Sequence, residues 1–137
     1  MKADEFAQRV LRECNADEEF SPFAAYDRDG DCIEFIADPD SYYAERVDGI
    51  VTVYYSEQSN AIIGAQIKGV SKLMKQYPGL MIEIHDGSVQ LHLLLRARLW
   101  EQDPRTADIA VMQYKKLIDL AEQSNARVRL DDLATAI

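Results

Sequence analysis

The chain is poor in cysteine and has no paired cysteine motif. Cys14 and Cys32 are its two cysteines, and no CxxC occurs among the 137 residues. Disulfide scaffolds and zinc ribbons need several closely spaced cysteines, so both classes are excluded. Both thiols are expected to be reduced and buried. A hydrophobic content of 47% is enough to form a core without a disulfide or a metal, and it predicts a single domain over residues 1–137.

The sequence also lacks a long apolar run. Residues 1–15 contain no apolar core of signal-peptide length. The densest apolar stretch, residues 91–99, is interrupted by His92, Arg96 and Arg98, so it is unsuited to crossing a bilayer. We therefore expect a cytoplasmic protein with no membrane partner.

Basic residues are scarce: 15 lysines and arginines stand against 24 acidic residues, which gives a net charge of -9. Residues 1–48 hold 14 acids and 5 bases, whereas residues 49–137 hold 10 of each. The electrostatic field of this negative charge repels a phosphate backbone, so nucleic acid is not an expected partner. The acidic first third either keeps the protein soluble or faces a basic partner or a cation.

Common catalytic and cofactor motifs are absent. The chain contains no GxGxxG, GxxxxGK[ST], GxSxG or HExxH pattern. We therefore predict no catalytic residue and no cofactor.

Four short runs of β-forming residues follow one another in the first half of the chain. These are residues 23–26, 32–37, 50–55 and 61–68. Because strands joined by short polar loops pair antiparallel, they predict an antiparallel sheet of about four strands. In the last run Ile63, Ala65 and Ile67 are expected on one face. Gly64 falls in the opposite set, at a bulge or under a close neighbour.

Helical spacing of apolar residues dominates elsewhere. The expected helices cover residues 3–14, 70–77, 91–101 and 103–123. Residues 91–101 also fit strand alternation, but their Leu, Ala and Arg content favours a helix. A small hairpin is predicted at Asp86-Gly87, and an edge strand at residues 126–130. The predicted fold class is α+β, with helices packed on one face of the sheet.

The acidic run Asp27, Asp29 and Asp31, with Asp38 further on, has the spacing of a calcium loop. Cys32 stands where such a loop needs glycine, and strand residues follow it. A hairpin turn therefore accounts better for the run: Asp27 accepts a hydrogen bond from the backbone two residues on, and Gly30 adopts positive φ. A weak cation site on these four aspartates is the alternative.

The histidines are weaker candidates for a metal site, and Cys32 is a weaker candidate for a catalytic nucleophile. His85 and His92 could meet Glu83 on one face of the predicted hairpin. Hairpin pairing, however, places the two histidines about three residue pairs apart, which is too far for a shared zinc ion. Surface histidines are the better interpretation. Cys32 has no oriented base in the sequence, so a packing role is expected for it.

Four tyrosines form two adjacent pairs near the predicted sheet: Tyr42, Tyr43, Tyr54 and Tyr55. Tyrosine combines a large apolar area with a polar tip, which suits both a sheet edge and a protein interface. We take them as candidate interface residues.

Residues 26–72 resemble a family of small bacterial domains of unknown function. Those domains read approximately Tyr-Asp-Pro-x-x-Asp-Ala-Leu-Tyr, then Gly-Ile/Val-x-x-Asp-Tyr and Val-Gly-x-x-Ile with a Ser-Lys segment. The counterparts here are YDRDGDCIEF, VDGIVTVYY and AIIGAQIKGVSK, with Arg28 in place of the proline. The resemblance implies a curled antiparallel sheet and supplies no catalytic residue.

The sequence thus favours a non-enzymatic, cytoplasmic protein-interaction domain that self-associates as a homo-oligomer. A protein partner or a second copy is expected at the acidic first third or the tyrosines. The alternative is a small-molecule-binding or hydrolytic domain that uses Asp27, Asp29 and Asp31, with or without a divalent cation.

Overall fold

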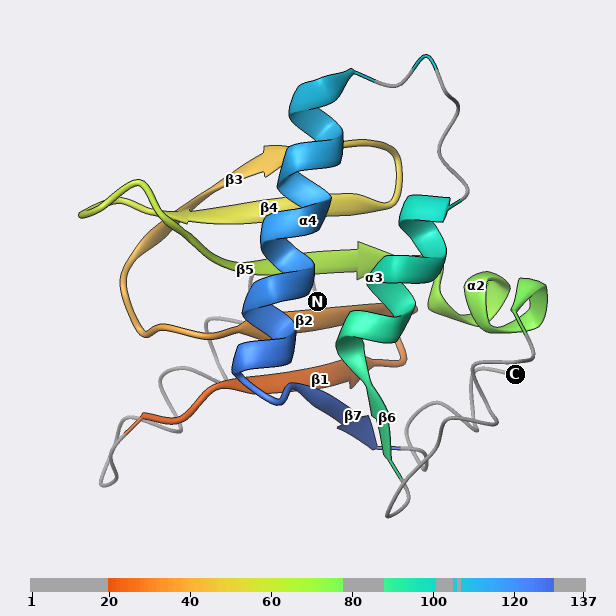
Figure 1. Cartoon of the computed structure of the whole chain (residues 1–137). Coiled ribbons are helices and arrows are strands. Elements are labelled where there is room, and N and C mark those ends of the chain that lie inside the picture. The colour runs from red at the N-terminus through yellow and green to blue at the C-terminus, as the bar shows by residue number, and fades with distance from the viewer. Residues whose placement is uncertain (1–19, 78–87, 101–104, 106, 130–137) are drawn as a thin grey trace.

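The computed structural model describes residues 20–77, 88–100, 105 and 107–129. The predicted helix at residues 3–14 and the predicted hairpin at Asp86-Gly87 lie outside these residues. The described part is an α+β structure, as predicted, in which one antiparallel sheet is covered by helices (Figure 1).

The main sheet has five strands in the order β1-β2-β5-β4-β3. Their bounds are β1 Phe23–Asp27, β2 Cys32–Ile36, β3 Tyr42–Arg46, β4 Val51–Ser56 and β5 Ile62–Lys68. Short turns join β1 to β2, β3 to β4 and β4 to β5, so these neighbours pair as hairpins. The pairing of β2 with β5 joins the β1–β2 hairpin to the part of the sheet formed by β5, β4 and β3. In the β4–β5 loop Asn60 adopts a φ of 60°, a left-handed conformation that asparagine tolerates.

Strand β3 was not predicted. Its sequence, YYAER, has four exposed residues out of five and therefore lacks the apolar alternation by which strands are recognised. Strand β3 forms through its pairing with β4, which is its only strand partner among the described residues. Its side chains can stay exposed because it lies at the edge of the sheet. The sheet consequently has one strand more than expected.

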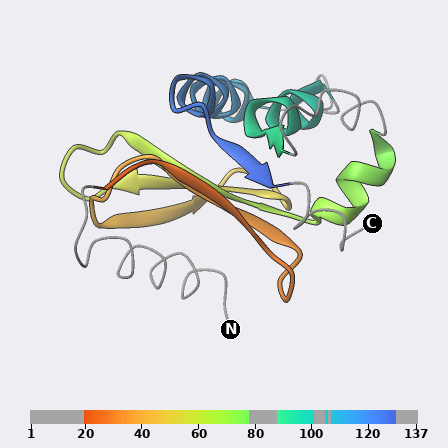
Figure 2. The same ribbon diagram turned by 90° about the horizontal axis from the view of Figure 1, so that it is seen from below.

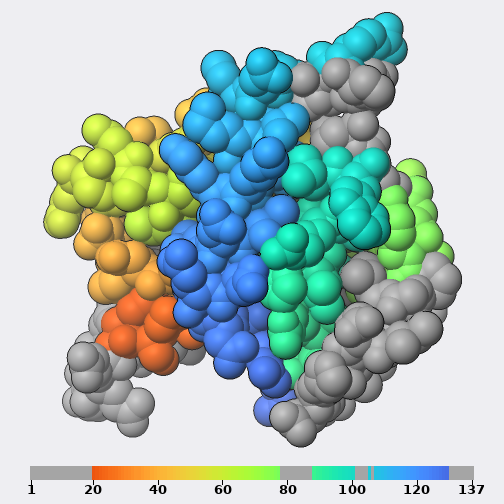
Figure 3. Space-filling view, in the orientation of Figure 1, coloured from red at the N-terminus to blue at the C-terminus, as the bar shows by residue number. Residues whose placement is uncertain are grey.

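Of the three described helices, the two longer ones lie on one face of the sheet, and the short one follows β5 beyond the end of that strand (Figures 1 and 2). The three helices are α2 Val70–Gln76, α3 Leu91–Trp100 and α4 Asp108–Gln123. Helices α3 and α4 lie side by side on this face (Figure 3). Residues 91–100 are therefore helical, as their composition favoured. None of the described helices is long and apolar enough to cross a membrane.

Two further strands connect the ends of these helices. Strand β6, Ser88–Gln90, precedes α3, and strand β7, Arg127–Arg129, follows α4. They pair antiparallel in a separate two-stranded sheet. The predicted strand at residues 126–130 is thus present, and β7 also contacts β1.

The strands bury side chains on both faces. Toward the helices, Phe35, Val53 and Ala65 belong to the large core. On the opposite face, which we call the far face, Ile36, Tyr54 and Ile63 form a second buried cluster. Ile63 was predicted to lie on the same face as Ala65. It does not, because the register shifts between Tyr54 and Tyr55 and reverses the alternation at that point.

Gly64 lies at this irregularity and against strand β2. A Cβ atom built on Gly64 would lie 2.1 Å from the backbone oxygen of Phe35. Both expectations for this glycine, a bulge and a close neighbour, are confirmed.

Candidate functional site

The acidic run forms the β1–β2 turn, and its carboxylates do not converge. The Asp29 N–H donates to Asp27 Oδ1 at 3.1 Å, so Asp27 makes the predicted turn contact. Positive φ falls on Asp31, at 48°, and not on Gly30 as predicted. Asp38 belongs to the next turn, where it accepts the Asp40 N–H at 3.2 Å.

Asp31 anchors helix α2 to this turn. Its carboxylate accepts hydrogen bonds from the Tyr26 hydroxyl at 2.6 Å, the Ser71 hydroxyl at 2.7 Å and the Ser71 N–H at 3.1 Å. Burial, followed by the Asp31 contact, raises the pKa of Tyr26 well above its ordinary value. Asp31 is thus occupied by structural contacts. Among the described residues, no group of three or more His, Cys, Asp or Glu side chains could hold a metal ion.

His92 of helix α3 contacts Gln90 and Arg96 as a neutral imidazole. Its Nδ1 accepts the Arg96 Nε–H at 3.1 Å, and its Nε2 lies 2.6 Å from Gln90 Oε1. Burial and the nearby Arg96 guanidinium lower the pKa of His92, which favours this neutral ring. His85 and Glu83 lie outside the described residues.

A polar cluster that the sequence did not reveal is buried on the far face. Glu34 of β2 is fully buried and accepts the Tyr54 hydroxyl at 2.6 Å and the Gln66 Nε2–H at 2.9 Å. These residues come from three adjacent strands, so the cluster connects the middle of the sheet. Because Glu34 has no exposed surface, we regard the cluster as structural.

Cys32 is buried near three carboxylates, those of Asp27, Asp31 and Glu34. Burial, with the negative charges of Glu34, Asp27 and Asp31, raises the pKa of the Cys32 thiol to about 12. We expect its alkylation at neutral pH to be at least about 100-fold slower in the native protein than in urea, because the thiolate is the reactive species. Iodoacetamide labelling followed by peptide mass spectrometry separates Cys32 from Cys14. Equal rates in native and unfolded protein would contradict a buried packing role.

The four candidate interface tyrosines lie on the β3–β4 hairpin but on opposite faces. Tyr42 packs on the buried Tyr54 on the far face, with ring centroids 4.4 Å apart. Tyr43 stacks on Tyr55 toward the helices, at 5.5 Å. Gln113 of α4 donates to the Tyr55 hydroxyl at 2.8 Å. Tyr43, 43% exposed, is the only one of the four among the exposed large hydrophobic residues.

The turn between β3 and β4 is joined to the helices by Asp48. Asp48 Oδ1 accepts the backbone N–H groups of Ile50 and Val51, each at 2.8 Å. Its Oδ2 accepts the Tyr114 hydroxyl at 2.5 Å, and Arg98 Nη2 lies 3.4 Å away. Burial alone would raise the pKa of Asp48, but these hydrogen bonds and the Arg98 charge outweigh it and lower the pKa. The Asp-Gly pair in VDGI was the available sequence signal for a turn at this position.

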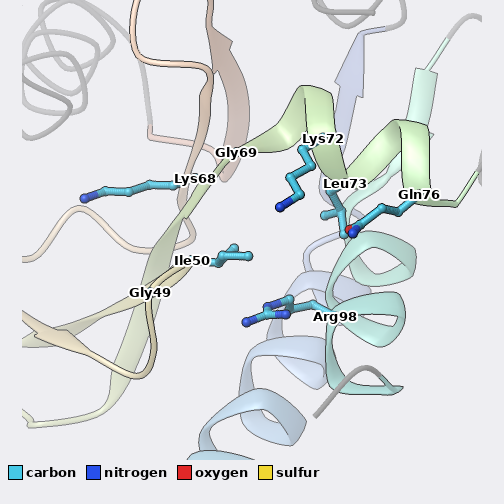
Figure 4. A pocket seen from close by; sticks show the side chains of 8 residues that line it. All are labelled: Gly49, Ile50, Lys68, Gly69, Lys72, Leu73, Gln76 and Arg98. Atoms are coloured by element: carbon cyan, nitrogen blue, oxygen red, sulfur yellow. The ribbon is translucent and has the colours of Figure 1, made fainter.

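Beside this turn lies a cavity of about 520 Å³, which we call the basic pocket. It is lined by Gly49, Ile50, Lys68, Gly69, Lys72, Leu73, Gln76 and Arg98. Three of these side chains are cationic and none is acidic. Figure 4 shows Lys72, Gln76 and Arg98 directed into the same space, while Lys68 extends away from it. No local sequence pattern indicated this site, because its residues come from a turn, a strand end and two helices.

No protein-family model matches the chain, and no curated protein or solved structure gives a significant match. The resemblance of residues 26–72 to small bacterial domains therefore stays a prediction.

Proposed function

We propose that the chain is a cytoplasmic, non-enzymatic protein-interaction domain that associates with a second copy of itself through strand β3. The observation that carries the proposal is the position of β3 at the edge of the sheet with four of its five residues exposed. An exposed edge presents unpaired N–H and C=O groups, which a strand of another chain can satisfy.

The direction of the backbone groups on β3 follows from the hydrogen bonds at its two ends. The Val47 N–H donates to the Val51 oxygen at 2.9 Å, and the Glu57 N–H donates to the Ser41 oxygen at 2.8 Å. Antiparallel pairing alternates, so the odd-numbered residues between them bond to β4. The N–H and C=O groups of Ala44 and Arg46 therefore point away from β4, toward the side of β3 on which no other described strand lies.

The side chains of β3 suit pairing with an identical strand. In an antiparallel pair centred on Ala44, Tyr42 lies opposite Arg46 of the second copy, and Tyr43 lies opposite Glu45. Arginine stacks favourably on an aromatic ring, and no like charges meet. The candidate interface residues Tyr42 and Tyr43 would then lie within the contact, while Tyr54 and Tyr55 support them from β4.

The substitution Ala44→Pro tests the proposal directly. It removes an N–H that points away from β4, and proline is tolerated at such edge positions. We expect the unsubstituted protein to be dimeric, with a Kd of about 10 μM or tighter, and the substitution to weaken association at least tenfold. Light scattering coupled to size-exclusion chromatography over a concentration series measures both.

Ala44→Val is the matched control, because it alters the same side chain and keeps the N–H; it should remain dimeric. The thermal midpoint of Ala44→Pro shows whether the β3–β4 hairpin persists. A monomeric unsubstituted protein, or equal dissociation by both variants, would reject the proposal. A basic partner for the acidic first third stays a separate prediction, and no contact described above favours hydrolysis or cation binding at the β1–β2 turn.

A further inference from the structure

We propose that the basic pocket binds a small organic oxyanion, a phosphate or carboxylate group attached to an apolar body. This site lies outside strand β3, and the inference does not depend on self-association. A cavity of about 520 Å³ falls within the size range of small-molecule sites.

The charge of the pocket is opposite to that of the protein. Its lining contains Lys68, Lys72 and Arg98 and no acidic residue, although the whole chain carries a net charge of -9. Of these three cations, Lys72 and Arg98 point into the pocket (Figure 4). In the described part of the chain, neither lysine forms an ion pair. Cations gathered in a cleft raise the local concentration of anions, so the ligand should be negatively charged.

Arg98 gives the pocket a positioned donor. Its side chain is only 19% exposed, and Asp48 Oδ2 lies 3.4 Å from its Nη2. Asp48 is itself held by the β3–β4 turn and by Tyr114. A guanidinium fixed in this way loses little freedom on binding, and its planar donors match the oxygens of phosphate and carboxylate groups.

The remaining lining residues define the rest of the ligand. Lys72 and Gln76 approach from α2 on the side opposite Arg98, so the anionic group would lie among these three side chains (Figure 4). Ile50 and Leu73 offer apolar surface beside them. An anion with a small apolar body would therefore use more of the pocket than an inorganic ion does.

Titration of the ¹⁵N-labelled protein with phenyl phosphate, benzoate, inorganic phosphate and benzyl alcohol tests the proposal. Phenyl phosphate or benzoate should shift the amide signals of residues 49–50 and 68–76 saturably, with a Kd of about 1 mM or below. The tighter of the two identifies the preferred oxyanion. Inorganic phosphate should bind at least tenfold more weakly, and the uncharged benzyl alcohol should cause no saturable shift.

Two lysine variants of helix α2 separate a site from general attraction. Lys72→Gln removes a lining charge and should weaken binding at least tenfold. Lys75→Gln removes the same charge from an exposed residue of the same helix outside the lining, so it should leave the Kd unchanged. The absence of saturation by either organic anion up to about 10 mM, or an equal loss with both variants, would overturn the proposal. The Ala44→Pro protein should bind as the unsubstituted protein does, which makes failure here distinguishable from failure of the β3 proposal.

Discussion

Substitution of Gly64 by alanine is expected to lower the free energy of unfolding by about 3 kcal/mol or more. The added Cβ would lie 2.1 Å from the Phe35 oxygen and 3.1 Å from the Phe35 carbonyl carbon. Both are backbone atoms of the neighbouring strand, so no side-chain rotation relieves the contact. Strands β2 and β5 would have to separate where the β1–β2 hairpin joins the rest of the sheet.

Thermal and urea denaturation measure this loss, which should appear as a fall in Tm of about 10 °C or more. Gly49→Ala is the matched control, because nothing lies within 4 Å of a Cβ built at that position. Its stability should change by no more than about 0.5 kcal/mol. An unchanged midpoint for Gly64→Ala would show that the two strands are not as close as described.

The second large effect is expected from Asp48→Asn, which should cost about 2 kcal/mol at neutral pH. The asparagine oxygen can still accept the N–H groups of Ile50 and Val51. The negative charge that accepts from Tyr114 and attracts Arg98 is lost, and these contacts join the β3–β4 turn to both long helices. Chemical denaturation at pH 7 measures the difference.

This contribution should depend on pH in one direction. Because the pKa of Asp48 in the folded protein lies below its ordinary value of 3.8, the charged form stabilises the fold. The benefit is complete above the unfolded-state pKa and is lost as the pH falls through the lower folded-state pKa. The stability difference between the unsubstituted protein and Asp48→Asn should therefore stay constant from neutral pH to about pH 5 and shrink toward about pH 2.

Two further variants make this assignment specific. Asp29→Asn removes the same charge from an exposed residue and should change stability by no more than about 0.5 kcal/mol. Tyr114→Phe should be destabilising alone but should add little in combination with Asp48→Asn, because both substitutions remove the same hydrogen bond, from the Tyr114 hydroxyl to Asp48. Strictly additive effects, or a difference that grows on acidification, would contradict the proposed role of Asp48.

Several local features were predictable because neighbouring residues decide them. The runs of β-forming residues at 32–37 and 50–55 identified strands β2 and β4. Helical spacing identified α4, which begins at Asp108 and not at residue 103 as predicted. The Asp27 turn contact and the φ of Asn60 follow from side chains and loop lengths within a few positions. Strand β3 was missed because an edge strand with exposed side chains carries no apolar pattern.

The candidate sites depended on contacts between distant segments. The sequence around Asp48 is typical of a turn, and only packing places this residue against Tyr114, 66 positions later. In the sequence Asp31 belongs to an acidic cluster, yet in the structure it accepts a hydrogen bond from the Ser71 hydroxyl, 40 positions later. No local pattern indicates such pairs, since each partner is typical of its own element.

By itself, the sequence determined the α+β class, most of the sheet, the long helices and the expectation of a buried, unreactive Cys32, because hydrophobic periodicity and turn chemistry act over short distances. The tertiary structure decided which residues share a surface. The order of the strands left β3 at an edge, and the packing of α2 and α3 beside the β3–β4 turn gathered cations into a pocket on an acidic protein. Charge is counted along a sequence, but the field at a site depends on which side chains folding brings together.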